Sequence, residues 1–282
     1  MSVIRAEDIP LYHVCPGGLV LRLVTPSTII IRCKGCWWDT ILASKNIIVR
    51  EANAETIMTK IKLIRPAVVM LDGIEPLSNE WAIDLLREIK RLWQGFVVIK
   101  TIGLCDSNYL REAIRNADGI VLEYLVPVKP ELAANRELHR NLEEVKGFAE
   151  KIPVELHIPY DGSKRADVVV SELSNEFANL AAIHIIPLSD VAYENAYKLI
   201  ERLYEDTVFL YLYKDESFIY TDTKCPYCGA LLVKRKPWGI SIDVDIGPEG
   251  IPSCRNCHKK LTMLRICKIK HVHSIHRELV IW

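Results

Sequence analysis

The 282-residue sequence has no net charge, since 36 Lys and Arg residues balance 36 Asp and Glu residues. The net charge of the chain therefore produces no electrostatic attraction to nucleic acid or to a membrane. Either partner would need a local patch of positive charge. The sequence also lacks an apolar run of the roughly 18 residues that span a bilayer, because IIIR, VVML and FLYLY are each soon interrupted. Its first residues, MSVIRAEDIP, contain no apolar segment of the signal-peptide type. We therefore expect no membrane association and a cytoplasmic protein.

Repeats of fixed period and low-complexity segments are also missing. From about residue 19 to residue 213, apolar β-branched runs alternate instead with helical patterns. The expected strands are LVLRLV, TIIIR, AVVML, FVVIKTIG, DGIVLEYL, PVELHIPY, AIHIIPL and TVFLYLYK, and the expected helices are NAETIMTKIKLIRP, EWAIDLLREIKRLW, DSNYLREAIRNA, ELAANRELHRNLEEVKGFAEKI, ADVVVSELSNEFANL and NAYKLIERLYED. About six such units predict an α/β fold, a partial (β/α) barrel around a parallel sheet.

The carboxyl ends of the strands are where such barrels carry their functional side chains. The segments that follow the expected strands are RCKGC, DGIEP, KTIGLCD, EYLVP, HIPYDG and HIIPLSD. We therefore expect the functional side chains of the barrel to lie in these segments.

The composition of the sequence changes after Lys214, where short segments rich in Gly, Pro and Cys begin. We therefore divide the chain into a barrel at residues 1–214 and a small domain at residues 215–282. The small domain holds two CxxC pairs separated by 25 residues, and their members are Cys225, Cys228, Cys254 and Cys257. Two chelating turns of this kind predict a four-thiolate zinc ribbon, with rubredoxin-like iron as the alternative. Four closed thiolates leave no open position, so we expect a structural or docking role.

Six of the nine cysteines lie in CxxC pairs. In a cytosolic chain this favours metal or redox chemistry over disulfides, because cytosolic thiols are kept reduced. The third pair is Cys33 and Cys36, directly after the β-branched run TIIIR.

A strand followed by cysteines, strand-end loops and a C-terminal CPxCG ribbon resembles the radical S-adenosylmethionine family over roughly residues 25 to 260. The similarity is to the pyruvate formate-lyase-activating-enzyme-like proteins of archaea and bacteria, the AmmeMemoRadiSam type. The resemblance implies a [4Fe-4S] cluster at a CxxxCxxC motif and S-adenosylmethionine on its fourth iron. It also matches the family's Gly-Gly-Glu-Pro and Thr/Ser-Asn-Gly motifs to DGIEP and TIG, which makes Gly73, Glu75, Pro76, Thr101 and Gly103 the candidate cofactor-binding residues.

Three positions depart from that pattern, and each carries isoleucine: Ile29, where the first cluster cysteine would fall; Ile74, in place of the second glycine; and Ile102, in place of the asparagine. Two thiolates leave such a cluster under-ligated, so either Cys15 or Cys105 replaces the missing ligand or the site is a remnant.

Two functions follow from these alternatives. The chain is a divergent member of the branch that has lost catalysis and acts as a scaffold whose ribbon docks a protein, or, less favoured, nucleic acid. Alternatively, it is an active radical enzyme that reductively cleaves S-adenosylmethionine and acts on a protein or a small substrate. The nucleic-acid alternative depends on the basic run KRKPW (residues 234–238) and on Arg255, Lys259 and Lys260, for which a solvated charged face is the default interpretation.

Overall fold

The computed structural model describes residues 1–25, 27–29, 31, 53–204, 207–215, 217–237, 239–247, 251–267 and 279–280. Within these ranges, no helix has the length and apolar character needed to cross a membrane.

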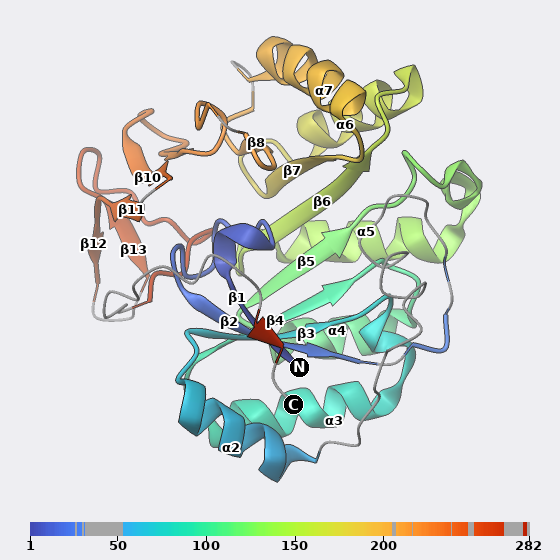
Figure 1. Cartoon of the computed structure of the whole chain (residues 1–282), viewed down its shortest axis with the longest axis vertical. Coiled ribbons are helices and arrows are strands. Elements are labelled where there is room, and N and C mark those ends of the chain that lie inside the picture. The colour runs from blue at the N-terminus through green and yellow to red at the C-terminus, as the bar shows by residue number, and fades with distance from the viewer. Residues whose placement is uncertain are drawn as a thin grey trace.

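The centre of the molecule is a nine-stranded sheet with the strand order β14-β1-β2-β3-β4-β5-β6-β7-β8 (Figure 1). Its strands are β1 (Ser2–Arg5), β2 (Leu19–Val24), β3 (Val68–Asp72), β4 (Phe96–Thr101), β5 (Gly119–Glu123), β6 (Val154–Tyr160), β7 (Ala182–Pro187), β8 (Leu210–Leu212) and β14 (Leu279–Val280). Strands β2 to β8 are parallel and neighbour one another in chain order, whereas β1 pairs antiparallel with β2 and β14 antiparallel with β1. The sheet therefore remains open between β14 and β8, which confirms the predicted α/β partial barrel.

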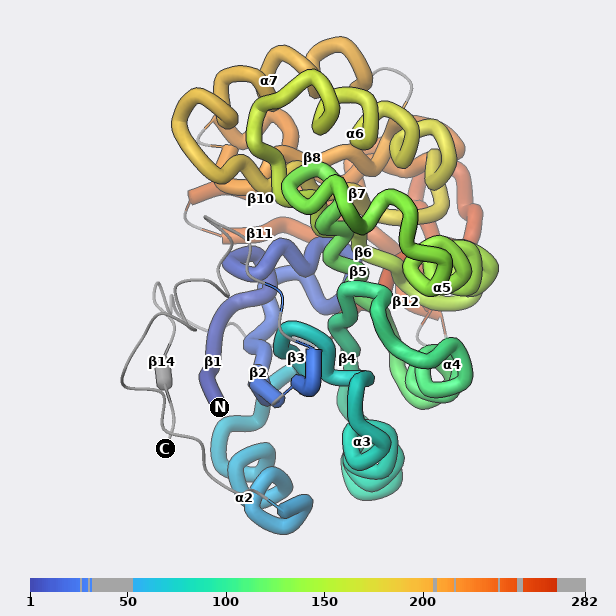
Figure 2. Tube along the Cα trace, turned by 90° about the vertical axis from the view of Figure 1, so that its right-hand side faces the viewer, coloured from blue at the N-terminus to red at the C-terminus, as the bar shows by residue number. Residues whose placement is uncertain are grey.

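The helices are α2 (Ala54–Ile64), α3 (Glu80–Leu92), α4 (Ser107–Arg115), α5 (Arg136–Phe148), α6 (Lys164–Glu176) and α7 (Asp190–Leu203). They flank one side of the sheet, as Figures 1 and 2 show together. Most of them begin at a side chain that caps the first turn: Asn53, Asp106, Asn135, Ser163 and Ser189 each accept a hydrogen bond from a backbone N–H. Such caps satisfy donors that a helix start leaves free, and so they fix where each crossover begins.

The two faces of the sheet carry different side chains because successive residues of a strand point to opposite sides. On β3 and β4, for example, Val69, Leu71, Val97 and Ile99 pack in the large cluster with the helices. The alternate positions face the other side, which we call the inner face. Near the amino ends of β2 to β5 the inner face is apolar, with Val20, Val68, Met70, Val98 and Val121.

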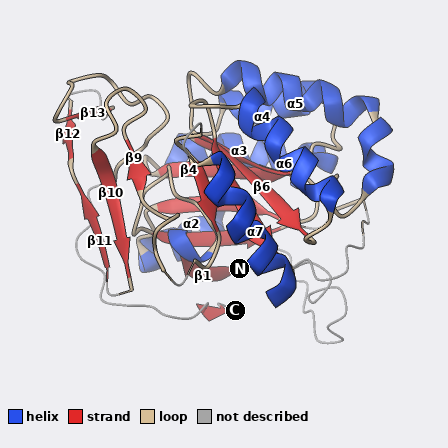
Figure 3. Ribbon diagram, turned by 90° about the horizontal axis from the view of Figure 1, so that it is seen from above, coloured by secondary structure: helices blue, strands red, loops and turns tan. Residues whose placement is uncertain are grey.

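The C-terminal region forms two small sheets (Figure 3). These contain β9 (Thr223–Lys224), β10 (Leu231–Lys236) and β11 (Gly239–Ile242) in one sheet, and β12 (Val244–Ile246) with β13 (Pro252–Cys254) in the other. Their apolar residues form one cluster with Tyr12, Phe209 and Tyr211 of the barrel side. The C-terminal region thus shares a hydrophobic core with the inner face at β7 and β8.

Two predicted elements are wrong in detail. The described part of TIIIR, Thr28, Ile29 and Ile31, is neither strand nor helix. Both edges of β2 are already occupied, by β1 and β3, so the sheet offers this run no neighbour there. The helix expected from Glu131 to Ile152 is divided into a 3-10 helix (Pro130–Ala134) and α5, because Asn135 caps a new start. Strand β1 was not predicted.

Candidate functional sites

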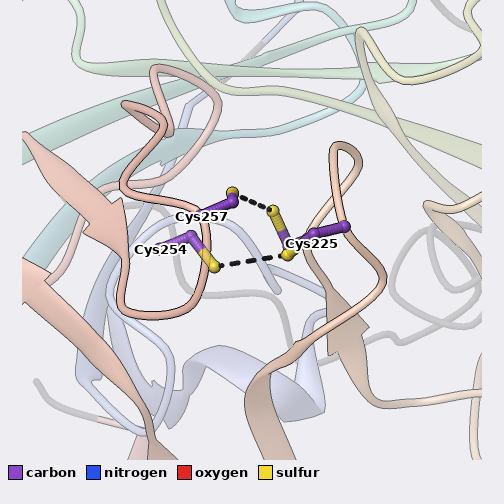
Figure 4. Close-up of side chains that lie close together, drawn as sticks. Cys225, Cys254 and Cys257 are labelled. Atoms are coloured by element: carbon purple, nitrogen blue, oxygen red, sulfur yellow. Dashed lines mark hydrogen bonds between the residues drawn. The ribbon is translucent and has the colours of Figure 1, made fainter.

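The four cysteines of the C-terminal region come together as the spacing predicted. Their sulfur atoms all lie within 4.8 Å of one another. Cys225 and Cys257 are 3.7 Å apart at sulfur, as are Cys228 and Cys254, so that the two turns face each other (Figure 4).

Both turns have the same backbone form. The N–H of Gly229 donates to the Cys225 carbonyl at 2.9 Å, and the N–H of His258 donates to the Cys254 carbonyl at 2.8 Å. Gly229 and His258 have φ values of 72° and 57°, so each turn closes with a left-handed residue after its second cysteine.

The sulfur arrangement fits a tetrahedral metal site. Four sulfurs about 2.3 Å from one ion lie about 3.8 Å apart, which agrees with the observed 3.7 Å. Thiolates suit both zinc and iron at this distance, so geometry supports a metal without distinguishing between the two.

The second candidate site lies where β3 and β4 end, and its centre is Glu75. The carboxylate is fully buried. It accepts hydrogen bonds from the Thr101 hydroxyl at 2.8 Å and 2.9 Å, from the N–H of Ile102 and of Leu104 at 3.1 Å, and from the N–H of Leu77 at 3.2 Å. Burial raises the pKa of Glu75 to about 7 against the opposing effect of these donors. Glu75 therefore joins the two strand-end loops to each other, and protein donors already occupy its oxygens.

The other residues predicted from the DGIEP and TIG motifs lie beside Glu75 and also make internal contacts. Gly73 has φ +149° and packs so closely on Thr25 that an added Cβ would lie 2.8 Å from the Thr25 carbonyl oxygen. Pro76 is buried and begins a 3-10 helix (Pro76–Ser78). The Thr101 hydroxyl accepts from the Gly103 N–H at 2.9 Å. The structure thus brings the five predicted residues to one edge of the sheet, held by contacts within the chain.

The isoleucines that depart from the family pattern meet at this same edge. Ile74, Ile102 and Leu125 form a buried apolar cluster, and Ile29 and Ile31 pack against it together with Leu104, Val128 and Leu132. Ile29 and Ile31 of the run TIIIR thus cover the strand-end loops with β-branched side chains.

Cys15, one of the two suggested substitute ligands, is wrong for that role. Cys15 forms a disulfide with Cys267, which also corrects the expectation that disulfides are disfavoured. It precedes β2, so it lies at the amino ends of the strands, where the carbonyl of Cys15 accepts from Gly18. The cluster motif belongs at the opposite, carboxyl ends.

Cys105 is a free, buried thiol in the cluster between sheet and helices. Its sulfur lies 3.8 Å from the Thr101 hydroxyl and 3.8 Å from the Asn141 side-chain amide. Burial, with the negative charge of Glu75, raises the pKa of this thiol well above its ordinary value. Cys33 and Cys36 lie outside the described residues, so their distance from Cys105 stays open.

No family model and no curated protein matches the chain. Among solved structures, the chain is similar to Streptococcus suis SuiB bound to S-adenosylmethionine, with 15% identity, a TM-score of 0.46, and coverage of 66% of this chain and 43% of SuiB. A second SuiB structure has 16% identity and a TM-score of 0.47, and the match covers 66% of this chain and 45% of SuiB. A domain of pyruvate-formate lyase-activating enzyme from Bacteroides vulgatus gives 18% identity and a TM-score of 0.41, over 51% of this chain and 97% of that domain. The chain spans less than half of SuiB, and its function has to be inferred from its own residues.

A row of buried charges on the inner face was not predicted. Arg22 Nε donates to Asp72 at 2.8 Å, Lys100 Nζ lies 3.5 Å from Asp72 and 2.6 Å from Glu123, and all four residues are buried. The signal was present in the sequence, because Arg22, Asp72, Lys100 and Glu123 stand in or at the end of apolar strands. Alternation places all of them on one face.

The row continues along β6 and β7 as a buried cluster of Glu155, His184 and His13. His184 Nε2 and a Glu155 oxygen are 2.5 Å apart, while the other Glu155 oxygen accepts from the His13 N–H at 2.7 Å. Burial lowers the pKa of His184 and raises that of Glu155, so burial disfavours the charged form of each partner. Tyr12 packs edge-on against His184 and covers this part of the inner face.

We expect an Asp72→Asn substitution to destabilise the fold by about 3–5 kcal/mol, because it leaves one uncompensated positive charge in the buried row of Arg22, Lys100 and Glu123. Burial alone would raise the pKa of Asp72, but Arg22 and Lys100 together hold it below its usual range. This carboxylate therefore contributes stability at neutral pH that is lost as pH falls through its folded pKa. Urea unfolding at several pH values measures both effects.

Asp84→Asn is the matched control, since Asp84 pairs with Arg87 on an exposed helix surface and should leave stability near that of the wild type. An equally stable Asp72→Asn protein would contradict the ion-pair account.

The basic run of the ribbon is divided between core and surface, since Arg235 is buried whereas Lys234 and Lys236 are exposed. Arg235 is buried, with its guanidinium 4.0 Å from the centre of the Tyr12 ring and donating to the Tyr12 carbonyl at 2.8 Å. Arg255 is paired with Asp243 at 2.7 Å and with Asp245 at 3.0 Å. Arg235 therefore anchors the ribbon to the barrel, and the charge of Arg255 is compensated. Trp238 lies outside the described residues.

Proposed function

We propose that this protein is a radical S-adenosylmethionine-type barrel that has lost cofactor chemistry and works as a metal-stabilised binding scaffold. The observation that carries the proposal is the apolar cluster of Ile74, Ile102 and Leu125, with Ile29 and Ile31 packed on it, at the edge where the sequence motifs place the cofactor. Because polar groups lose hydrogen bonds in apolar surroundings, this edge disfavours the amino and carboxylate groups of S-adenosylmethionine.

The state of Glu75 supports the same proposal. A residue that binds a ligand needs free hydrogen-bonding capacity, and both oxygens of Glu75 are committed to donors within the chain. The active-enzyme alternative also needs a third cluster ligand. Cys15 is bonded to Cys267, and the thiol of Cys105 contacts Thr101 and Asn141 in the core.

We propose that the four-cysteine site of the ribbon holds zinc and that the ligand of the scaffold is a protein. Four closed thiolates leave the metal without an open position, which suits a structural ion. The burial of Arg235 and the pairing of Arg255 reduce the basic surface of the ribbon, and its exposed lysines are left as a solvated charged face, which makes nucleic acid the less favoured ligand.

Equilibrium dialysis with labelled S-adenosylmethionine, after anaerobic iron–sulfur reconstitution, tests the loss of cofactor binding. We expect no saturable binding to the wild type. We expect none to the single variants Ile29→Cys and Ile74→Gly either. Saturable binding to the wild type would contradict the proposal. Because the assay uses the cofactor and not a partner, its result does not depend on which protein the scaffold binds.

A further inference from the structure

The disulfide between Cys15 and Cys267 joins two parts of the chain that are 252 residues apart. Cys15 belongs to the loop between β1 and β2 on the barrel side, and Cys267 follows the ribbon. The two parts also pair through their backbones. Cys15 N–H donates to the Arg265 carbonyl at 2.8 Å, and Arg265 N–H donates to the His13 carbonyl at 2.8 Å.

Other contacts hold this junction independently of the sulfur bond. The Arg265 guanidinium donates to the carbonyls of Thr262 at 2.8 Å, Leu264 at 2.9 Å and Lys151 at 2.9 Å, and the last of these lies on the barrel just beyond α5. Cys15 itself has φ 50°, and Gly18 is packed so closely that an added Cβ would lie 2.9 Å from the Cys15 carbonyl oxygen. The two cysteines are thus held side by side by the fold, and their proximity does not depend on the covalent bond.

The two cysteines differ in burial. Cys15 is fully buried, whereas Cys267 as a residue is partly exposed. We therefore expect a thiolate from solution to attack the sulfur of Cys267, with Cys15 as the leaving group. A bond that is reachable from one side and whose partners stay in place when it breaks has the features of a reversible pair.

We propose that Cys15 and Cys267 are a reversible thiol–disulfide pair that fastens the end of the ribbon to the barrel, under the control of a dithiol reductant. One thiolate of the reductant attacks the Cys267 sulfur, the S–S bond breaks, and Cys15 leaves as a thiolate that takes up a proton. The second thiol of the reductant then closes its own disulfide and releases Cys267 as a thiol. Two electrons pass from the reductant to the protein. The backbone hydrogen bonds of the junction still hold the two cysteines near each other, but the junction opens transiently more often than when the bond is present.

The pair is detected by peptide mapping of the full chain, purified without reductant and alkylated in denaturant. We expect one cross-linked peptide pair that contains Cys15 and Cys267, lighter by two hydrogen atoms than its two parts. Recovery of both cysteines as alkylated thiols, also after the folded protein has been exposed to a disulfide oxidant, would overturn the proposal.

The effect of the pair is measured by hydrogen exchange of the wild type before and after reduction with a phosphine, at constant zinc content. We expect the amides of Cys15 and Arg265 to exchange about tenfold faster or more once the cross-link is lost, because local opening is then no longer restrained. Cys267→Ser should exchange like the reduced wild type, and Cys105→Ser, which removes a buried thiol elsewhere, should exchange like the oxidised one. Unchanged exchange on reduction would show that the bond controls nothing, even if it is present.

Discussion

Cys254→Ser should lose its metal and the order of the ribbon together. The two CxxC turns carry short strands with little apolar surface of their own, and a structural zinc site contributes on the order of 10 kcal/mol in zinc-finger peptides. Cys254 is buried and faces Cys228 across the site, so its loss removes one corner of the tetrahedron. We expect the metal content measured by mass spectrometry to fall from about one ion per chain to none, with loss of the tertiary signals of β9 to β13 by NMR.

The ribbon shares its cluster with Tyr12, Phe209 and Tyr211, so the damage should spread to the inner face at β7 and β8. Cys105→Ser is the matched control and should retain the metal, because Cys105 lies in the barrel core. A Cys254→Ser protein with the wild-type metal content would contradict a four-thiolate site.

The second large effect is expected for Glu75→Ala, which should destabilise the fold by about 4 kcal/mol. The substitution leaves the N–H groups of Ile102 and Leu104 buried without an acceptor, and each such group costs about 1–3 kcal/mol. It also removes the partner of the Thr101 hydroxyl, so the loops after β3 and β4 lose their common anchor. Urea unfolding measures the loss of stability.

Glu75→Gln separates charge from hydrogen bonding. The folded pKa of Glu75 is raised to about 7, above its ordinary value, so the native state holds this proton more tightly than the unfolded chain does. The contribution of protonated Glu75 is therefore present at low pH and is lost as pH rises through about 7. The wild type should therefore lose free energy of unfolding as pH rises through about 7, whereas Glu75→Gln should not. Any advantage in stability that the wild type has over Glu75→Gln at low pH should become smaller over this pH range. The control is Glu88→Ala, which removes an exposed carboxylate paired with Arg91 and should change stability little. If Glu75→Ala had the same free energy of unfolding as Glu88→Ala, the anchoring role of Glu75 would be contradicted.

Much of the barrel was predictable because its parallel strands are buried on both faces and read as apolar runs between helical patterns. The run TIIIR shows the limit of that signal. A β-branched segment that covers a hydrophobic cluster looks the same in sequence as one that pairs in a sheet, and only the occupied edges of β2 decide between them.

The metal-binding cysteines were predictable because each ligand pair is local, with two residues between its cysteines. The Cys15–Cys267 bond gave no such signal, since 252 residues separate its partners. The family resemblance named Glu75 and Thr101 as candidate cofactor-binding residues, and this role stays a prediction. The resemblance did not reveal that their hydrogen-bonding groups are used inside the chain.

These features give a consistent physical account of a scaffold. The inner face is covered by the ribbon near β7 and β8 and carries compensated buried charges near β2 to β5. The edge that corresponds to the cofactor motifs is filled with apolar side chains. On the function proposed above, such a molecule would offer its fold and its ribbon, stabilised by metal at the four cysteines, to a partner.

The most direct test is the iron, sulfide and zinc content of the full chain after anaerobic purification and reconstitution, with electron paramagnetic resonance of the dithionite-reduced protein with and without S-adenosylmethionine. The account predicts about one zinc per chain at the four thiolates and no cluster signal. About four irons with a signal that shifts on addition of S-adenosylmethionine would contradict it and restore the radical enzyme.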